Sequence, residues 1–263
     1  MTMDKYSRLT GLLELLTERG KLDIDEVAAE LGVSAATIRR DFDSLAQQQL
    51  LTRTRGGAVS NSVSYDLPLR YKTSRHADEK LRIGAAAASL IRRGCVLGLS
   101  GGTTSTEVAR AITARGSLQI LDGEPAVTIV TNAVNIANEL TVRPQVKIVM
   151  TGGVARPQSY ELIGPLATAT LAGLTLDLAI LGVNGIDAGY GASVDNEGEA
   201  AVNALMAARA RQVVVVADSS KLGHRAFALV CPVTTIDMLI TDIRASDDTV
   251  AAFEKAGIET RRV

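Results

Sequence analysis

One stretch, residues 33–57, constrains the fold of this chain more than any other. Ser34 is a residue type that caps helix N-termini, because its hydroxyl accepts a hydrogen bond from a free amide of the first turn. After it, Ile38, Phe42 and Leu45 recur at i, i+4 and i+7, which is the spacing of one apolar helix face. The sequence therefore predicts a helix that begins just after Ser34 and packs through this face.

The opposite face of the predicted helix is small and basic. It carries Ala36, Arg39, Arg40 and Asp43. Small side chains beside guanidinium groups suit a helix that enters the major groove of DNA, where arginine makes forked contacts with guanine edges or phosphates. This pattern predicts a DNA-reading helix.

A partner helix is predicted just before it, over residues 25–31. Val27, Ala28 and Leu31 share one side of this helix, and Gly32 follows as a residue that tolerates the positive backbone torsion of a helix end. Two helices joined by a glycine-containing turn, with exposed arginine on the second, form a helix-turn-helix. An ordinary helical hairpin with a solvated charged face is the alternative.

Residues 50–59, after the reading helix, favour DNA binding over that alternative. Polar and basic side chains alternate there as in a strand, and the alternation breaks at Gly56 and Gly57. This is the composition of a β-wing that lies along phosphates. The predicted DNA-binding residues are Ser34, Ala36, Thr37, Arg39, Arg40, Arg53 and Arg55.

Composition is compatible with DNA binding but does not demand it. The chain has 263 residues, of which 46% are hydrophobic and 22% charged, and its net charge is -1. This length suggests about two domains. Within residues 31–60 the arginines outnumber the aspartates, so a modest basic patch lies on the predicted reading surface. A patch this small predicts that a dimer or larger assembly binds the DNA.

Cysteine usage and hydropathy indicate a cytoplasmic protein. Cys95 and Cys231 lie far apart beside apolar runs and form no CxxC motif, so we expect buried free thiols in a reducing compartment. The chain shows no signal peptide and no apolar run long enough to span a bilayer. No cofactor, metal site or catalytic residue is predicted.

The predicted organisation is a DNA-binding domain over residues 1–60, a linker over 61–73 and a second domain over 74–263. The linker is polar, contains Pro68 and lacks a helical period. Beyond Gly94, short apolar runs alternate with amphipathic helices, which predicts an α/β domain whose largely parallel sheet is covered on both faces. The predicted strands are residues 95–99, 127–130, 146–150, 176–181, 212–217 and 236–240.

The turn after the first of these strands is the first candidate binding site, because ligands bind at the carboxyl ends of strands in such sheets. It consists of Ser100, Gly101, Gly102, Thr103 and Thr104, and it leads directly into a predicted helix. Free backbone amides and hydroxyls at a helix N-terminus suit a phosphate. The alternative is a tight turn whose hydroxyls only cap the helix.

Three further strand ends carry glycine, amide or charged residues. The pair Gly152-Gly153 follows the third predicted strand, and the pair Asn184-Gly185 follows the fourth. After the fifth strand, Lys221 could neutralise a phosphate, while Asp218 could hold that lysine or a sugar hydroxyl. A salt bridge or a loop cap is the alternative for this last pair.

Several motifs of the N-terminal part resemble the signature of the DeoR/GlpR family of bacterial sugar-metabolism repressors. They are Val33-Ser34, Thr37-Ile38-Arg39-Arg40-Asp41, Leu45 and the segment from Arg53 to Ala58. Family members usually have leucine at Phe42, glutamate at Ala46 and histidine at Arg55. Phe42 keeps the apolar face and Arg55 keeps a side chain that can contact phosphate.

The second half resembles the same family. It contains a Gly-Thr-Thr loop, Thr131-Asn132-Ala133, a Thr-Gly-Gly segment, a Leu-Gly-x-x-Gly-Ile segment and an Asp-x-Ser-Lys segment, in that order. The resemblance implies a fold related to ribose-5-phosphate isomerase and the CoA-transferases, used to sense a phosphorylated sugar or related metabolite. Ser100 stands where many members have aspartate, which leaves the effector open. The predicted effector-binding residues are Ser100, Gly101, Gly102, Thr103, Thr104, Asn132, Gly152, Gly153, Asn184, Gly185, Asp218 and Lys221.

The sequence thus predicts a transcriptional regulator that binds double-stranded operator DNA as a homodimer or homotetramer. Repression of carbohydrate-metabolism genes, relieved by a phosphorylated sugar, is the expected activity. A sugar-phosphate isomerase or CoA-transferase-like enzyme is the alternative. Isomerisation needs a positioned carboxylate base. The turn at Asn184 offers no such base, although Asp195 and Glu197 stay as candidates.

Overall fold

The computed structural model describes residues 4–48, 50–60, 69, 76–120 and 123–263. The chain separates into two compact units, Met1–Arg75 and His76–Val263. The predicted linker lies outside the described residues, apart from Leu69. In the part that is described, no helix combines the length and the apolar character that a membrane crossing requires.

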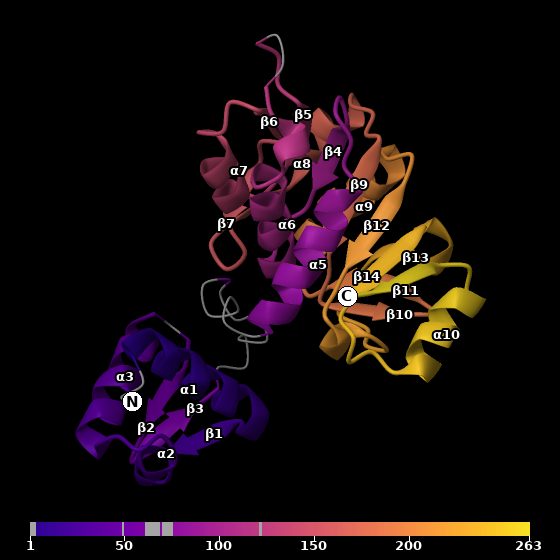
Figure 1. Cartoon of the computed structure of the whole chain (residues 1–263). Helices are drawn as coiled ribbons and strands as arrows, with labels where there is room; N and C mark the ends of the chain where they lie inside the picture. The colour runs from indigo at the N-terminus through magenta and orange to yellow at the C-terminus, as the bar shows by residue number, and fades with distance from the viewer. Residues whose placement is uncertain (1–3, 49, 61–68, 70–75, 121–122) are drawn as a thin grey trace. The chain divides into compact units, whose positions relative to one another are not determined.

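Over residues 4–48 and 50–60, the N-terminal unit has three helices and a three-stranded antiparallel sheet (Figure 1). The sheet has the order β1-β3-β2, so the first strand lies against the hairpin that forms the wing. That first strand is absent from the sequence-based prediction. The elements are α1 (Lys5–Arg19), β1 (Lys21–Asp23), α2 (Ile24–Glu30), α3 (Ala35–Gln47), β2 (Thr52–Thr54) and β3 (Gly57–Val59).

The predicted apolar face of α3 forms the centre of this unit's core. Ile38, Phe42 and Leu45 are fully buried, and they pack with leucines of α1 and with Val27 of α2. Side-chain caps define where the helices begin, since Asp4, Asp23 and Ser34 accept hydrogen bonds from first-turn amides of α1, α2 and α3.

The wing requires glycine at two positions, for two different physical reasons. Gly56 lies in the turn between β2 and β3 at a φ of 86°, which glycine adopts without strain. A Cβ added to Gly57 would lie 2.1 Å from the carbonyl oxygen of Leu22, because β3 pairs closely with β1 there. The glycine pair therefore closes the wing and also attaches it to the rest of the unit.

The C-terminal unit is built on a seven-stranded sheet of order β15-β14-β12-β9-β4-β5-β6. Every neighbouring pair in this sheet is parallel, which confirms the predicted α/β class. Its strands are β4 (Val96–Leu99), β5 (Val127–Thr131), β6 (Val146–Met150), β9 (Leu178–Gly182), β12 (Val213–Val216), β14 (Met238–Thr241) and β15 (Glu259–Arg262).

Helices cover both faces of the sheet, as the unbroken apolar strands predict. One face packs against α5 (Ala77–Ser89), α6 (Thr103–Thr113) and α7 (Val134–Leu140), of which α5 and α6 lie side by side (Figure 1). The other face packs against α8 (Pro165–Ala172), α9 (Glu197–Arg209) and α10 (Asp247–Lys255).

Short strands that the sequence-based prediction lacks complete this unit. A hairpin of β7 (Val154–Arg156) and β8 (Glu161–Ile163) follows β6. A small antiparallel sheet of β10 (Gly185–Asp187), β11 (Gly191–Val194) and β13 (Ala228–Pro232) lies beside the main one. These strands have three to five residues, too few for a clear alternation of polar and apolar side chains.

The expectation of two buried thiols is correct for Cys231 and wrong for Cys95. Both cysteines are free, but Cys95 precedes β4 instead of opening it and is only partly buried. Burial raises the pKa of each thiol to about 11, so neither is reactive near neutral pH. Among the described residues, no three His, Cys, Asp or Glu side chains gather as a metal site would require.

Candidate DNA-reading surface and effector site

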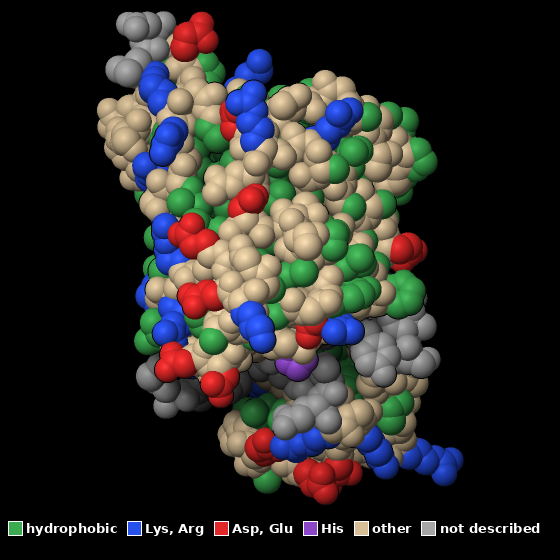
Figure 2. Space-filling model, turned by 90° about the vertical axis from the view of Figure 1, so that its right-hand side faces the viewer, with side chains coloured by type: hydrophobic (Ala, Val, Ile, Leu, Met, Phe, Trp, Pro, Cys, Tyr) green, Lys and Arg blue, Asp and Glu red, His purple; other side chains and the backbone are tan. Residues whose placement is uncertain are grey.

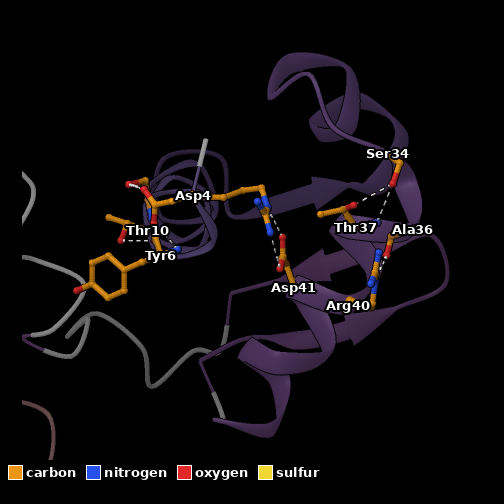
Figure 3. Close-up of polar contacts among 10 residues, drawn as sticks. Asp4, Tyr6, Thr10, Ser34, Ala36, Thr37, Arg40 and Asp41 are labelled. Carbon is orange, nitrogen blue, oxygen red and sulfur yellow. Dashed lines mark hydrogen bonds and ion pairs between the residues drawn. The ribbon is translucent and has the colours of Figure 1, made fainter. Parts of the chain in front are cut away.

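Helix α3 exposes the residues that the sequence predicts will read DNA. Ala36, Arg39, Arg40 and Asp43 are all exposed, on the face opposite the buried stripe. The Nε of Arg40 donates to the carbonyl of Ala36 at 3.3 Å, so this side chain lies back along its own helix (Figure 3). The two guanidinium groups are thus carried on a rigid helix and face outward from the core.

Ser34 and Thr37 fix the start of α3. The Ser34 hydroxyl accepts from the amide of Thr37 at 3.2 Å, and the two hydroxyl oxygens lie 2.9 Å apart (Figure 3). Ser34 and Thr37, which the sequence predicts to contact DNA, thus also cap the N-terminus of α3.

A buried ion pair that the sequence-based prediction lacks holds α3 against α1. The Nε of Arg8 donates to Oδ2 of Asp41 at 2.5 Å, and Asp41 is 2% exposed. Figure 3 shows Asp41 turned away from the reading face. The hydrogen bond to Asp41 raises the pKa of Arg8. Asp41 is consequently neutralised inside the unit and does not reduce the exposed basic charge, although the sequence alone counts it against that charge.

The wing carries two arginines in different settings. Arg55 is exposed in the β2–β3 turn. Arg53 pairs with Asp43 at 3.1 Å, stacks over the Phe42 ring at 5.5 Å, and donates to the carbonyl of Gly57 at 3.3 Å. Arg53 therefore braces the wing against α3, while Arg55 has the freer guanidinium group.

In the C-terminal unit, the strand order brings the predicted effector residues to one edge of the sheet. The strands β12, β9, β4, β5 and β6 are consecutive neighbours and run parallel, so their carboxyl ends are adjacent. The segments that follow those ends contain all twelve predicted residues. Basic and acidic side chains are interspersed over the visible face of this unit, without one dominant sign (Figure 2).

The turn after β4 begins α6 without a side-chain cap. Gly102 occupies the cap position at a φ of 109° and α6 makes no side-chain capping bond, so the predicted alternative of capping hydroxyls is wrong. The Ser100 hydroxyl instead accepts from the amide of Gly182 at 2.9 Å and donates to the carbonyl of Gly101 at 3.3 Å. Ser100 thereby ties β4 to β9, and the first amides of α6 stay available to an anion.

Several other predicted residues have internal structural roles. Asp218 caps the short helix η2 (Ser219–Lys221) by accepting from the amide and hydroxyl of Ser220, which matches the loop-cap alternative. Asn184 Oδ1 accepts from the amide of Asp195 at 3.3 Å. A Cβ on Gly185 would lie 2.5 Å from the carbonyl oxygen of His224, and one on Gly153 would lie 2.7 Å from that of Ile163.

The residue that the sequence-based prediction misses at this edge is Glu161. The β7–β8 hairpin returns along the end of β5, where the amide of Leu162 donates to the carbonyl of Asn132 at 2.7 Å. This places Glu161 so that its Oε2 accepts from Nδ2 of Asn132 at 2.9 Å. Glu161 stands alone in a short, irregular segment of sequence, so no spacing or motif signals its position.

Burial and a neighbouring acid shift the ionisation of Glu161. Desolvation and the charge of Glu199 raise its pKa to about 8, despite the opposing hydrogen bond from Asn132. Glu199 lies on α9 and pairs with Arg156 of β7 at 3.0 Å. Burial and the charge of Glu199 therefore favour the neutral carboxyl group of Glu161.

Two buried polar atoms near Glu161 lack a hydrogen-bond partner. Within the described part of the chain, Ser105 Oγ and Asn132 Oδ1 are buried and make no hydrogen bond. Native proteins satisfy nearly all such atoms, with a ligand or an ordered water where the chain itself does not. Both atoms lie near the start of α6, where an ordered water or a polar ligand would supply the missing partner.

Comparison with known proteins agrees with this division into two functional parts. Residues 8–64 match the model of the DeoR-like helix-turn-helix domain, and residues 75–243 match that of the DeoR C-terminal sensor domain. The HTH-type transcriptional regulator GlpR of Haloferax volcanii is 33% identical over 252 residues, which cover 95% of each protein. The glycerol-3-phosphate regulon repressor of Escherichia coli (strain K12) is 31% identical over 240 residues, covering 91% of this chain and 92% of that protein.

Among solved structures, ribose 5-phosphate isomerase A of Methanocaldococcus jannaschii aligns with 56% of this chain and 54% of its own, with a TM-score of 0.41 and 19% identity. The two full-length relatives are named as regulators of transcription and not as isomerases or transferases. The chain belongs to the DeoR family of DNA-binding transcriptional regulators.

Proposed function

We propose that this protein represses genes by binding operator DNA through α3 and the wing, and that a phosphorylated sugar or related metabolite relieves the repression. The observation that carries the proposal is the uncapped start of α6, at a glycine turn on the carboxyl edge of the sheet. Such a helix start is a ready anion site, because its amides and its dipole both favour negative charge. The name of the Escherichia coli relative, a glycerol-3-phosphate regulon repressor, supports the same reading.

In this proposal the reading surface divides its work between bases and phosphates. Arg39 and Arg40 contact base edges and flanking phosphates, since both are exposed on the face of α3 opposite the core. Arg55 contacts a phosphate from the turn of the wing. Arg53 supports the wing, because its guanidinium group pairs with Asp43 of α3. Ser34, Ala36 and Thr37 approach the backbone at the start of the helix.

The effector site is proposed to centre on the turn from Gly101 to Thr104. The amides of Gly102, Thr103 and Thr104 hold the phosphate, and Lys221, in the segment after β12 at the same edge of the sheet, neutralises part of its charge. Asn132 provides polar contacts to the rest of the molecule. The remaining predicted residues shape the edge of the sheet, namely Ser100, Gly152, Gly153, Asn184, Gly185 and Asp218.

Binding to paired half-sites requires at least a homodimer. A repressor of this kind works in the cytoplasm, where the bacterial chromosome lies. Large apolar side chains that are exposed in the C-terminal unit offer surface for such an assembly. Leu166 is 68% exposed, Phe227 79% and Ile243 68%. Sedimentation of the full chain would reveal its oligomeric state, and a strictly monomeric protein at DNA-binding concentrations would contradict the paired-site part of the proposal.

The test is a titration of the full chain against DNA from its own upstream region, followed by fluorescence anisotropy. Adding glycerol 3-phosphate, glucose 6-phosphate and other sugar phosphates is expected to weaken DNA binding for at least one of them. Lys221→Ala is expected to bind the same DNA but to need at least tenfold more of that effector. The matched control, Lys255→Ala on α10, should respond like the wild type. Unchanged DNA affinity with every phosphorylated sugar would refute effector control of this kind.

A further inference from the structure

The carboxyl group of Glu161 lies directly on the backbone of the proposed anion turn. An ideal Cβ on Gly101 would lie 2.4 Å from Cγ of Glu161 and 2.5 Å from its Cδ and Oε1. The amide of Gly101 donates to this carboxyl group, and Asn132 Nδ2 donates to Oε2 at 2.9 Å. The side chain is thus held from two strand ends at once, beside the amides that would receive a phosphate.

The charged groups that face Glu161 come from two elements. Glu199 of α9 and Arg156 of β7 pair with each other at 3.0 Å, and their side chains are 8% and 15% exposed. The charge of Arg156 also favours the carboxylate of Glu161, but burial and the charge of Glu199 outweigh it. Burial then favours its neutral form, in keeping with a pKa raised to about 8.

A neutral carboxyl group and a carboxylate would treat an anionic ligand in opposite ways. The neutral acid has an O–H that can donate to a phosphate oxygen, as an amide does. The carboxylate offers only acceptor oxygens and repels the phosphate in a region from which water is excluded. The orphaned Ser105 Oγ and Asn132 Oδ1 nearby add two more partners for a hydroxylated ligand.

We propose that Glu161 is a specificity-determining residue of the effector site, which donates a hydrogen bond as a neutral acid to an oxygen of the anionic group bound at the Gly101 turn. This inference rests on the proposed function, because it assumes that the effector is an anion held by that turn. It assigns a role to a residue that neither the sequence motifs nor the proposed phosphate contacts include. It also makes effector affinity depend on the protonation of one carboxyl group.

The expected pH profile follows from linkage. The bound anion raises the pKa of Glu161 further, because a nearby negative charge disfavours the carboxylate. At pH values below the pKa that Glu161 has in the ligand-free protein, the affinity for the anion is therefore constant. At higher pH, Glu161 takes up a proton each time the anion binds, so the affinity falls by up to about tenfold per pH unit. A phosphate monoester is already a dianion in this range, since its second pKa is about 6.

The experiment is isothermal titration of the full chain with inorganic phosphate, glycerol 3-phosphate and glucose 6-phosphate, using whichever probe binds most tightly. Affinity is measured from about pH 7 to about pH 9.5, in two buffers of different ionisation enthalpy, so that proton uptake is counted directly. The wild type is expected to lose affinity above about pH 8 and to take up close to one proton there. Glu161→Gln keeps a neutral donor and is expected to bind with a pH-independent affinity.

The matched control is Glu197→Gln, which neutralises an exposed acid at the start of α9 and should keep the wild-type profile. A wild type whose affinity is constant across the range, with no proton uptake, overturns the inference and leaves the proposed function standing. A pH dependence that persists in Glu161→Gln overturns it as well. If no probe binds the wild type at any pH, the proposed effector site itself fails and the inference falls with it. The proton count on the wild type keeps the test decisive should Glu161→Gln fold poorly.

Discussion

At the scale of single residues, exposure separates the side chains that can act on DNA from those that only build the module. Arg39, Arg40 and Arg55 are exposed, whereas the neighbouring Asp41 is buried in an ion pair within the unit. The positive charge of the reading surface is consequently larger than the sequence suggests. In the C-terminal unit the decisive residue is Glu161, whose burial sets its charge.

Replacing Arg39 or Arg40 with alanine tests the reading face. Each change is expected to weaken operator binding by about 1–3 kcal/mol if that arginine makes a forked contact with a base. Stability should hardly change, because both residues are exposed and face away from the core. Anisotropy with operator and scrambled DNA gives the affinities, and urea unfolding gives the stability. Lys5→Ala, an exposed cation on α1, is the control, and an equal loss with Lys5→Ala would argue against specific reading by α3.

Glu161 should also make stability depend on pH. Its pKa in the folded chain is raised to about 8 from an ordinary value of 4.5, so between these values the unfolded chain has released a proton that the folded chain retains. Stability therefore falls as pH rises through this window, by at most about 1.4 kcal/mol per pH unit from this group.

Glu161→Gln removes this contribution because glutamine does not titrate. As pH rises from about 5 to about 8, the free energy of unfolding of the variant is expected to increase relative to that of the wild type. The increase should be on the order of a few kcal/mol. Urea unfolding of both proteins across this range measures the difference. A constant difference would mean that Glu161 is ionised in the folded protein.

At the scale of elements, the N-terminal unit is held together by an ion pair as well as by its apolar core. Arg8 of α1 and Asp41 of α3 are both largely buried, with side-chain exposures of 12% and 3%. The pair holds α3 against α1, on the side away from the exposed Arg39 and Arg40. Polar contacts of this kind determine the orientation of α3, while the apolar stripe supplies most of its stability.

Breaking this pair is expected to destabilise the N-terminal unit strongly. Asp41→Ala removes the carboxylate to which Arg8 donates, and losing one member of a largely buried pair costs about 3–5 kcal/mol in comparable cases. The double variant Arg8→Met/Asp41→Leu should recover most of that loss, since well-packed apolar residues often replace a buried pair at little cost. Circular dichroism during urea unfolding measures both. A loss below about 1 kcal/mol for Asp41→Ala would place the pair among ordinary surface ion pairs.

At the scale of the whole molecule, the chain joins two units that each have their own core. The buried residues of α1–α3 form one apolar cluster, and those of the parallel sheet and its helices form two others. Separate cores allow separate unfolding transitions. A ligand that binds only the C-terminal unit should therefore stabilise one transition and leave the other in place.

An effector at one hundred times its dissociation constant is expected to add about 2.7 kcal/mol to the stability of the C-terminal unit. Calorimetry of the full chain should show that transition moving to higher temperature, while the transition of the N-terminal unit stays fixed. Operator DNA should have the opposite selectivity. A shift of both transitions by the effector alone would mean that the two units unfold as one cooperative body.

Much of this fold is readable from local sequence patterns. The apolar stripe of Ile38, Phe42 and Leu45, and the unbroken run of β12, determine element type, because helix and strand periods are local properties of the chain. Element order then predicts a parallel sheet, and the carboxyl edge of that sheet predicts where a ligand binds. This reasoning predicts the turn at Gly101 and Gly102 as a binding site.

What only the tertiary structure decided is which residues meet across long separations in sequence. Asp41 pairs with a helix 33 residues away, and Asn132 reaches Glu161 29 residues later, through a hairpin whose strands are too short to show a pattern. Burial and electrostatic interactions exist only once these segments are packed, so no local pattern contains the partner of Asp41 or the raised pKa of Glu161. The sequence alone determined the reading helix, six strands of the main sheet and the family, because these depend on residue spacing. Packing determined the partners of both acids and the raised pKa of Glu161, because electrostatic energy depends on distance in space and on the exclusion of water.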